Sequence, residues 1–163
     1  MNYASIRTCD VANGEGIRVS LFVSGCTHHC KGCFNEEAQA FDYGEPFTAE
    51  VENRLLDALK PDYVSGLTLL GGEPMEPANQ RALMPLLRRF RAQYGETTTL
   101  WVYTGCLYEK LREEGYPWRT EVTDEFLSFV DVLVDGPFVE SLRDLTLRFR
   151  GSSNQRILEL KRL

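Results

Sequence analysis

Short apolar runs separated by polar stretches recur along the chain and predict buried strands. The clearest is RVSLFV at residues 18–23, where β-branched and aromatic residues lie between glycines. GLTLL at residues 66–70 is a continuous apolar run, which is typical of a parallel strand covered on both faces. Two later runs, TTTLWVY at residues 97–103 and VDVLVD at residues 130–135, complete a set of four predicted strands.

Between these strands, apolar residues recur at the three- and four-residue intervals of an amphipathic helix. Residues 48–59 carry Val51, Leu55 and Leu59 on one face, and Thr48 can cap the first turn. Further helices are expected over residues 77–93, with a kink or a later start at Pro85, over residues 106–114, and from Thr123 as a cap.

The order of these elements predicts the fold class. Strands that alternate with helices form right-handed βαβ units and a parallel sheet. A complete eight-stranded barrel needs about 200 residues or more, whereas this chain has 163. We therefore expect an α/β fold, a partial, open (β/α) barrel with a mainly parallel curved sheet, built as one domain over residues 1–163. The ends, residues 5–13 and 146–163, should add extended segments.

Composition narrows the classes of function. The net charge is −6, which is unfavourable for sequence-independent binding of nucleic acid. No apolar run approaches the roughly 18 residues needed to span a membrane, and the N-terminus has no signal-peptide core. We therefore expect a cytoplasmic protein. Five cysteines in such a protein are more consistent with metal binding or catalysis than with disulfides.

Three of these cysteines lie in one loop directly after the first strand, SGCTHHCKGCFN at residues 24–35. Cys26, Cys30 and Cys33 can converge on one metal centre. Spacing alone leaves three possibilities: a [4Fe–4S] cluster with one iron open to a ligand, a zinc site completed by a histidine, or three buried thiols. We favour the cluster, because zinc sites usually draw their ligands from two knuckles. His28 and His29 are then expected to be solvated spacers.

A second motif, Gly71-Gly72-Glu73-Pro74, follows the strand at residues 66–70. Glycines after a strand are often a simple turn. Two of them can also let the backbone approach a ligand closely, and their exposed backbone groups can bind a small zwitterion. Glu73 can fix the loop or meet an ammonium group.

Two further candidate residues, with a weaker sequence signal, follow the third and fourth predicted strands. They are expected at the same edge of the sheet as the cysteine loop. Thr104 ends the third strand, and Asp135 ends the fourth. Asp135 can orient a cofactor or bind a cation, or it can simply form a turn. Cys9 and Cys106 are expected to be plain, partly buried thiols, because Lys110 is the one basic residue near Cys106 in the sequence.

The cysteine spacing resembles the signature of the radical S-adenosylmethionine enzymes. The longer run from Asn13 to Asn35 is similar to the start of the glycyl-radical-enzyme activating proteins, which place a Gly-x-Gly-Ile-Arg run ahead of the strand. Here that run is Gly14, Gly16, Ile17 and Arg18. The segment RFRGSSNQR at residues 148–156 resembles the C-terminal signature of the anaerobic ribonucleotide reductase activating family.

The resemblance implies two cofactors. Cys26, Cys30 and Cys33 would hold a [4Fe–4S] cluster, and S-adenosylmethionine would bind beside it. The residues implied for S-adenosylmethionine are Gly71, Gly72, Glu73, Pro74, Phe34, Asn35, Thr104 and Asp135. The superfamily usually has an aromatic residue before the last cysteine; Gly32 stands there, and Phe34 can supply the ring instead.

The resemblance also implies the reaction and the partners. Reductive cleavage of S-adenosylmethionine would give a 5′-deoxyadenosyl radical, which takes hydrogen from a glycine of the anaerobic ribonucleotide reductase large subunit. A low-potential donor such as flavodoxin or ferredoxin would supply the electron. Two alternatives remain: another small radical enzyme with a different protein or small-molecule substrate, and a metal-binding interaction module.

Overall fold

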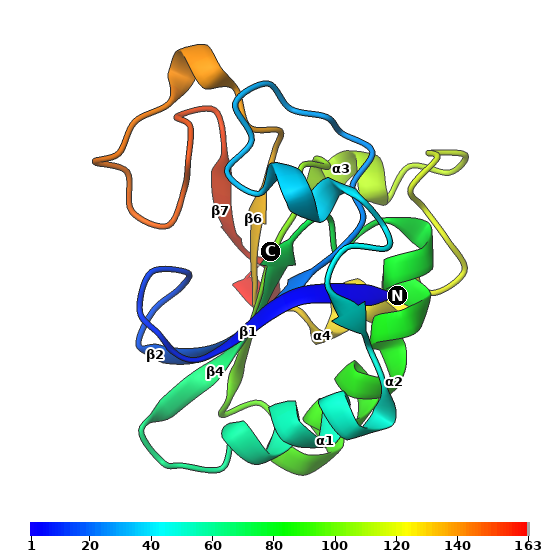
Figure 1. The fold of residues 1–163 in the computed structure, drawn as a ribbon, viewed down its shortest axis with the longest axis vertical. Coiled ribbons are helices and arrows are strands. Elements are labelled where there is room, and N and C mark those ends of the chain that lie inside the picture. Colours follow the sequence, from blue (N-terminus) through cyan, green and yellow to red (C-terminus); the bar gives the residue numbers. More distant parts are fainter. Residues whose placement is uncertain (163) are drawn as a thin grey trace.

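The computed structural model describes residues 1–162, whose centre is one seven-stranded sheet in the order β3-β1-β2-β4-β5-β6-β7 (Figure 1). The strands are β1 (Asn2–Asp10), β2 (Ile17–Val23), β3 (Glu45–Pro46), β4 (Val64–Gly71), β5 (Thr99–Tyr103), β6 (Val132–Asp135) and β7 (Arg156–Glu159). The helices are α1 (Ala49–Ala58), α2 (Pro77–Tyr94), α3 (Tyr108–Leu111) and α4 (Thr123–Phe129), with short 3-10 helices η1 (Glu36–Gln39), η2 (Glu140–Leu142) and η3 (Leu160–Arg162).

The direction of the strands differs between the middle and the edges of the sheet. The inner strands β2, β4, β5 and β6 are parallel, as their alternation with helices predicts. The outer strands β1, β3 and β7 are antiparallel to their neighbours, so the expected parallel arrangement holds for the centre of the sheet and the sheet as a whole is mixed. An α/β fold with an unclosed sheet is confirmed, and its description as a partial barrel stays a prediction.

The antiparallel edge strands are hard to predict from the sequence, because few of their side chains are buried and apolar. β1 begins at Asn2 and is nine residues long, well beyond the expected lead-in, but most of its side chains are exposed or half-buried. Its stability comes from pairing with β2 rather than from its own apolar residues. In the tail, residues 146–150 form turns instead of an extended segment, and Arg156–Glu159 pairs with β6. Leu163 lies outside the described residues.

The helix ends confirm one predicted cap and correct another. Thr48 caps α1, because its hydroxyl accepts a hydrogen bond from Val51 N at 3.4 Å. Thr123 does not cap α4: Val122 is the capping residue, and the Thr123 hydroxyl donates to Gln80 Oε1 at 2.7 Å. α2 continues through Pro85, and α3 is shorter than expected. Over residues 1–162, no helix has the length and apolar character needed to cross a membrane.

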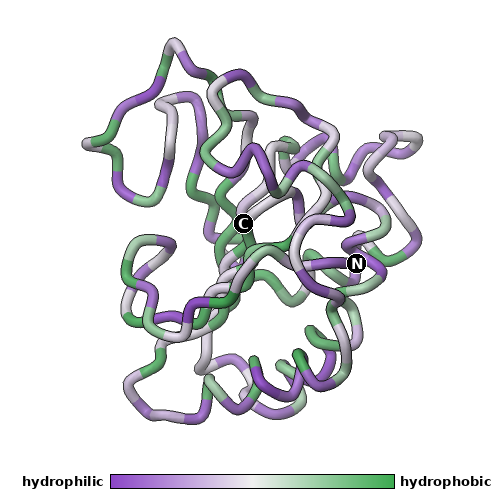
Figure 2. Tube along the Cα trace, in the orientation of Figure 1, coloured by the Kyte–Doolittle hydropathy of each residue, from purple (hydrophilic) through white to green (hydrophobic). Residues whose placement is uncertain are grey.

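The side chains of the inner strands divide between two faces. Odd-numbered residues of β2 and β4 join the hydrophobic core with leucines of α1 and α2, as Leu21, Leu69 and Leu87 do. Along α1, hydrophilic and hydrophobic positions alternate, so only one side of the helix meets the sheet (Figure 2). The even-numbered residues of β2 and β4 point to the opposite face, which carries the candidate site.

Arg18 fills the base of that opposite face. Its side chain is fully buried, and the guanidinium donates to Thr68 Oγ1, Leu67 O, Thr99 O, Thr99 Oγ1 and Glu15 O. It also stacks on Trp101, with the guanidinium carbon 5.5 Å from the ring centroid. A Cβ at Gly14 would lie 2.7 Å from Arg18 Cδ, so glycine leaves the space that Arg18 occupies. The Gly-x-Gly-Ile-Arg run therefore supports this face of the sheet from within, although its own residues do not line the cleft.

Candidate functional site

The cysteine loop, residues 24–35, leaves the end of β2 and turns back over the sheet. Gly25 and Gly32 have φ angles of 99° and 72°, and His29 adopts 51°, so three left-handed residues bend the loop. Cys33 N donates to Cys30 O at 3.2 Å and closes the turn between the second and third cysteines. Cys26, Cys30 and Cys33 are free, half-buried thiols.

The Gly-rich loop, residues 71–74, is tied to the cysteine loop through the backbone. Gly72 N donates to Val23 O at 2.7 Å, and Glu73 N donates to Gly25 O at 2.8 Å. A Cβ at Gly72 would lie 2.6 Å from Gly25 O, which is backbone of the cysteine loop and not the open cleft. Glycine is required at position 72 for the contact between the two loops, and the approach of a ligand to this backbone stays a prediction.

Two side chains at the start of α2 strengthen the same junction. Asn79, which is 1% exposed, donates to Ser24 O at 3.0 Å and to Glu73 O at 2.9 Å. Glu76 accepts hydrogen bonds from the backbone and hydroxyl of Thr27, at 2.7 and 2.6 Å. The helix therefore fixes both loops with groups that the sequence motifs did not include.

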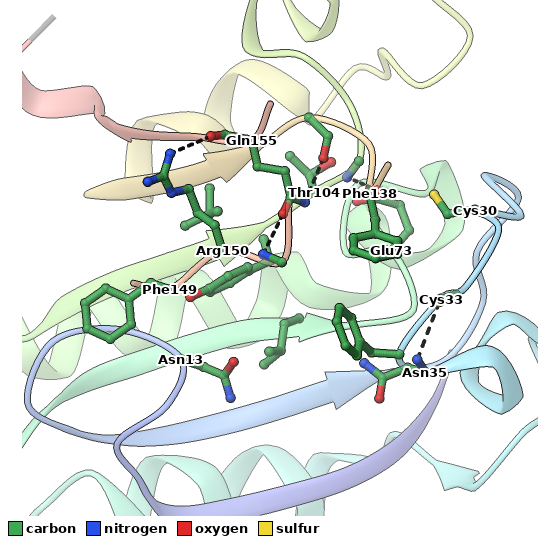
Figure 3. Close-up of a pocket in the computed structure, with 18 of the residues that line it drawn as sticks. Asn13, Cys30, Cys33, Asn35, Glu73, Thr104, Phe138, Phe149, Arg150 and Gln155 are labelled. Atoms are coloured by element: carbon green, nitrogen blue, oxygen red, sulfur yellow. Dashed lines mark hydrogen bonds between the residues drawn. The ribbon is translucent and has the colours of Figure 1, made fainter. Parts of the chain in front are cut away.

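These loops form one end of a cleft of about 510 Å³, which lies in the range usual for small-molecule sites. Cys30 and Cys33 lie at this end of the cleft, and Asn13, Phe149 and Arg150 lie at the other (Figure 3). Of the candidate site residues, those that line the cleft are Cys26, Cys30, Cys33, Phe34, Asn35, Gly71, Gly72, Glu73 and Thr104. The structure thus brings both sequence motifs to one cavity.

Two candidate residues are absent from the lining. Pro74, the last residue of the Gly-rich loop, is buried. Asp135 is fully buried, and its carboxylate accepts hydrogen bonds from Arg156 and from Tyr108 N at 2.8 Å. Alternation along β6 explains this position, because Val134 faces the cleft and Asp135 must face the other way. Any effect of Asp135 on a bound cofactor would be indirect.

The segment between β6 and β7 forms the wall of the cleft opposite the cysteine loop. We call residues 136–155 the tail loop. Gln155 holds it closed, because its side-chain oxygen accepts from Gly151 N at 2.8 Å and its amide donates to Gly136 O at 3.1 Å. Phe138 packs against Phe34 with ring centroids 5.0 Å apart. The RFRGSSNQR segment therefore contributes residues to this wall of the cleft.

His28 corrects the expectation of a solvated spacer. Its side chain is 14% exposed, and Nε2 donates to Glu73 Oε2 at 2.7 Å. The ring stacks on Trp118 with centroids 5.0 Å apart, and Cys106 Sγ lies 3.7 Å from Nε2. Burial alone would lower the pKa of His28, but the hydrogen bond and negative charge of Glu73 raise it. Sequence spacing gave no signal for this contact, because Glu73 and Cys106 come from distant segments.

The structure agrees with the predictions for His29 and Cys106 and differs from the prediction for Cys9. His29 is exposed, as expected of a spacer, although it contacts Gln39 Oε1 at 3.0 Å. Cys106 is a buried thiol, 1% exposed, and burial raises its pKa to about 12. Cys9 is exposed on β1, so the expectation of a partly buried thiol is wrong there.

The donor set of the cysteine loop fits a [4Fe–4S] cluster. Burial raises the pKa of Cys26 to about 12, so the free thiol is protonated and a bound metal would displace its proton. Asn35 N points at Cys33 Sγ at 3.4 Å, the type of N–H···S contact that supports cluster sulfurs.

A mononuclear zinc site fits the same loop less well. The sulfurs on one tetrahedral zinc lie about 4 Å apart, as Zn–S bonds of about 2.3 Å require. Over the described chain, one set of three ligand atoms lies mutually within 4.8 Å, and its members are His28, Glu73 and Cys106. The three loop cysteines do not form such a set among the described residues, so their sulfurs would have to move closer to share one zinc.

Comparisons with known proteins agree with this chemistry. A family described as a 4Fe-4S single cluster domain matches residues 12–158. The anaerobic ribonucleoside-triphosphate reductase-activating protein of Pasteurella multocida (strain Pm70) is 39% identical over 157 residues, 95% of each chain. The protein of that name from Escherichia coli (strain K12) is 37% identical over 163 residues, 99% of this chain and 100% of the relative. The one from Enterobacteria phage T4 is 37% identical over 157 residues, 96% and 93% of the two chains.

Proposed function

The chain belongs to the family of anaerobic ribonucleoside-triphosphate reductase-activating proteins, and we propose that it generates a glycyl radical on the large subunit of anaerobic ribonucleotide reductase. In this proposal it is a radical S-adenosylmethionine enzyme. One observation supports it above the others: the three free thiols and the Gly-rich loop line the same cleft.

Cys26, Cys30 and Cys33 are the proposed cluster ligands, and three ligands leave one iron of a four-iron cluster open. When bound, the cluster would supply one electron for reductive cleavage of S-adenosylmethionine into methionine and a 5′-deoxyadenosyl radical, and that radical would take a hydrogen atom from the target glycine to give 5′-deoxyadenosine. The protein contributes position and shielding to this chemistry.

The Gly-rich loop is the proposed contact for the amino acid part of S-adenosylmethionine. Gly71 and Gly72 present backbone to the cleft beside the cysteines. Phe34 and Phe138 offer two rings at the cleft wall for the adenine, and Asn35 and Thr104 offer polar groups nearby. In this arrangement Asp135 acts through Arg156, by fixing the strand end that carries the tail loop.

The partner completes the site. Radical chemistry needs protection from solvent, yet the rim of the cleft carries exposed apolar side chains, with Phe34 56% exposed and Leu145 81% exposed. We propose that the glycine-bearing segment of the reductase covers these residues and forms the missing wall. The electron donor, flavodoxin or ferredoxin, and the cytoplasmic location stay predictions. No observation favours another radical substrate or an interaction module.

The proposal is tested by anaerobic reconstitution with iron and sulfide, followed by an assay for 5′-deoxyadenosine under reducing conditions. The wild-type chain should hold about four irons and cleave S-adenosylmethionine. Cys30→Ala should lose both properties, because it removes one of three protein ligands. Cys106→Ala should keep the cluster. Full cluster content and cleavage in Cys30→Ala would overturn the ligand assignment.

A further inference from the structure

The carboxylate of Glu73 is fully engaged by the protein. Oε1 accepts from Met75 N at 2.8 Å. Oε2 accepts from Gly105 N at 2.8 Å and from His28 Nε2 at 2.7 Å. The residue is 1% exposed. A carboxylate with three donors cannot turn toward a ligand without leaving buried N–H groups unpaired, so the role of Glu73 is to fix the Gly-rich loop.

Among these three donors, His28 alone belongs to the cysteine loop. It lies between Cys26 and Cys30, so it joins the proposed cluster loop to the loop that lies across the cleft end. Its ring stacks on Trp118 at an interplanar angle of 14° and lies close over Gly105, where a Cβ would come within 2.8 Å of it. The hydrogen bond to Glu73 is therefore held in one geometry.

We propose that His28 is a positioning residue that acts through Glu73: it holds the Gly71–Gly72 backbone in the conformation that binds S-adenosylmethionine, without ligating the cluster itself. This inference rests on the proposed function, since it assigns a role within the same site. The backbone bonds from Gly72 to Val23 and from Glu73 to Gly25 anchor the base of the loop. The His28–Glu73 hydrogen bond, which we call the brace, adds a side-chain link at the point where the Gly-rich loop leaves β4.

A second metal ion is the competing explanation of the His28, Glu73 and Cys106 group. Two ligands of one zinc at about 2.0–2.1 Å lie roughly 3.3 Å apart in a tetrahedral site. The His28 Nε2 to Glu73 Oε2 distance is 2.7 Å, which is a hydrogen bond length. Oε2 also accepts from Gly105 N, which further occupies the lone pair that a metal would need. The geometry favours a hydrogen-bonded brace.

The test compares variants of the reconstituted chain by three readouts: iron and zinc content, equilibrium binding of S-adenosylmethionine, and the electron paramagnetic resonance spectrum of the reduced cluster. His28→Leu removes the donor and should weaken binding roughly 10- to 100-fold at normal iron content, as loss of an outer-shell partner does. The change that S-adenosylmethionine causes in the cluster spectrum should fall in parallel. His28→Gln keeps an N–H donor and should restore binding in large part.

His29→Asn is the matched control, because it removes the neighbouring imidazole while asparagine tolerates the φ angle of 51°. It should bind S-adenosylmethionine as the wild type does. Glu73→Gln completes a double-mutant cycle. If His28 acts through Glu73, His28→Leu with Glu73→Gln should bind no more weakly than Glu73→Gln alone.

Several outcomes would overturn the inference. Wild-type affinity in His28→Leu would show that the brace is irrelevant to binding. Loss of iron in His28→Leu would show that His28 supports the cluster loop itself. One equivalent of zinc in the wild type, absent from both His28→Leu and Cys106→Ala, would show a metal site. A wild-type chain that holds its cluster but binds no S-adenosylmethionine would instead refute the proposed function, and the inference with it.

Discussion

At the scale of single residues, Arg18 has the greatest influence on how the site is built. Its guanidinium is buried without a carboxylate partner, and its hydrogen bonds join β2 to β4 and β5 under the cleft. Burial lowers its pKa to about 10. A planar fork can reach several acceptors at once, which an ammonium group cannot do.

We expect Arg18→Lys to destabilise the fold by about 2–4 kcal/mol, because buried carbonyls of Leu67 and Thr99 lose their donors. Urea denaturation of the metal-free chain under reducing conditions measures this. Arg88→Lys is the control: Arg88 pairs with Glu125 on the exposed surface, and such pairs contribute little. Equal midpoints for Arg18→Lys and the wild type would contradict the role of Arg18.

At the scale of elements, the two loops behave as one unit because their backbones touch. This changes the expectation for Gly72. The sequence suggests that glycine at this position lets the backbone approach a ligand closely. In the structure a side chain there would press on Gly25 O and on Ala38 O, at 2.6 and 2.8 Å, which belong to the cysteine loop and the segment after it.

Gly72→Val should therefore lower iron content and S-adenosylmethionine binding together, because the cysteine loop must shift to admit the side chain. Iron analysis after reconstitution measures the first effect. Gly115→Asn serves as the control, because Gly115 is exposed and a Cβ there meets nothing within 4 Å. A Gly72→Val chain with full iron content and weakened binding would restore the earlier interpretation of this glycine.

Asp131 joins other elements on the far side of the sheet. It accepts hydrogen bonds from Arg91 of α2 and from Leu100 N of β5, and it pairs with Lys161 of η3. Burial alone would raise its pKa, but these partners lower it below the ordinary 3.8. Its stabilising contribution is therefore present above about pH 3.8 and is lost as the pH falls through the lowered value.

Asp131→Asn should cost about 1–3 kcal/mol at pH 7, since a charge-assisted network loses its anion. The difference from the wild type should shrink as the pH falls below about 3.8, where the carboxyl of the unfolded chain begins to bind a proton, and vanish below the lowered pKa of the folded state. Urea denaturation of both chains between pH 3 and 7 gives the comparison. A difference that stays constant over this range would show that the charge of Asp131 is not what stabilises the junction.

At the scale of the whole molecule, the inner half of the fold follows from local patterns. Residues 18–23 and 66–70 are short, mainly apolar runs that predict buried strands, and both motifs follow strands whose ends meet at one edge of the sheet. The antiparallel edges and the tail loop could not be predicted, because their conformation depends on partners far away in the sequence. The same holds for His28, whose partner Glu73 is 45 residues away.

The cleft is open to solvent at its rim, which bears on how the reductase reaches it. The chain has exposed apolar residues at the cleft rim and a proposed cluster at one end, so the target glycine must be brought in by another protein. A product on that partner is therefore a more direct test than any property of this chain alone.

The decisive measurement is electron paramagnetic resonance of the anaerobic ribonucleotide reductase large subunit after anaerobic incubation with the reconstituted chain, reductant and S-adenosylmethionine. We predict the doublet of a glycyl radical with the wild-type chain and none with Cys33→Ala. If the wild-type mixture forms 5′-deoxyadenosine but the reductase never shows that doublet, while another glycyl-radical protein or a small molecule is turned over, the proposed target is wrong.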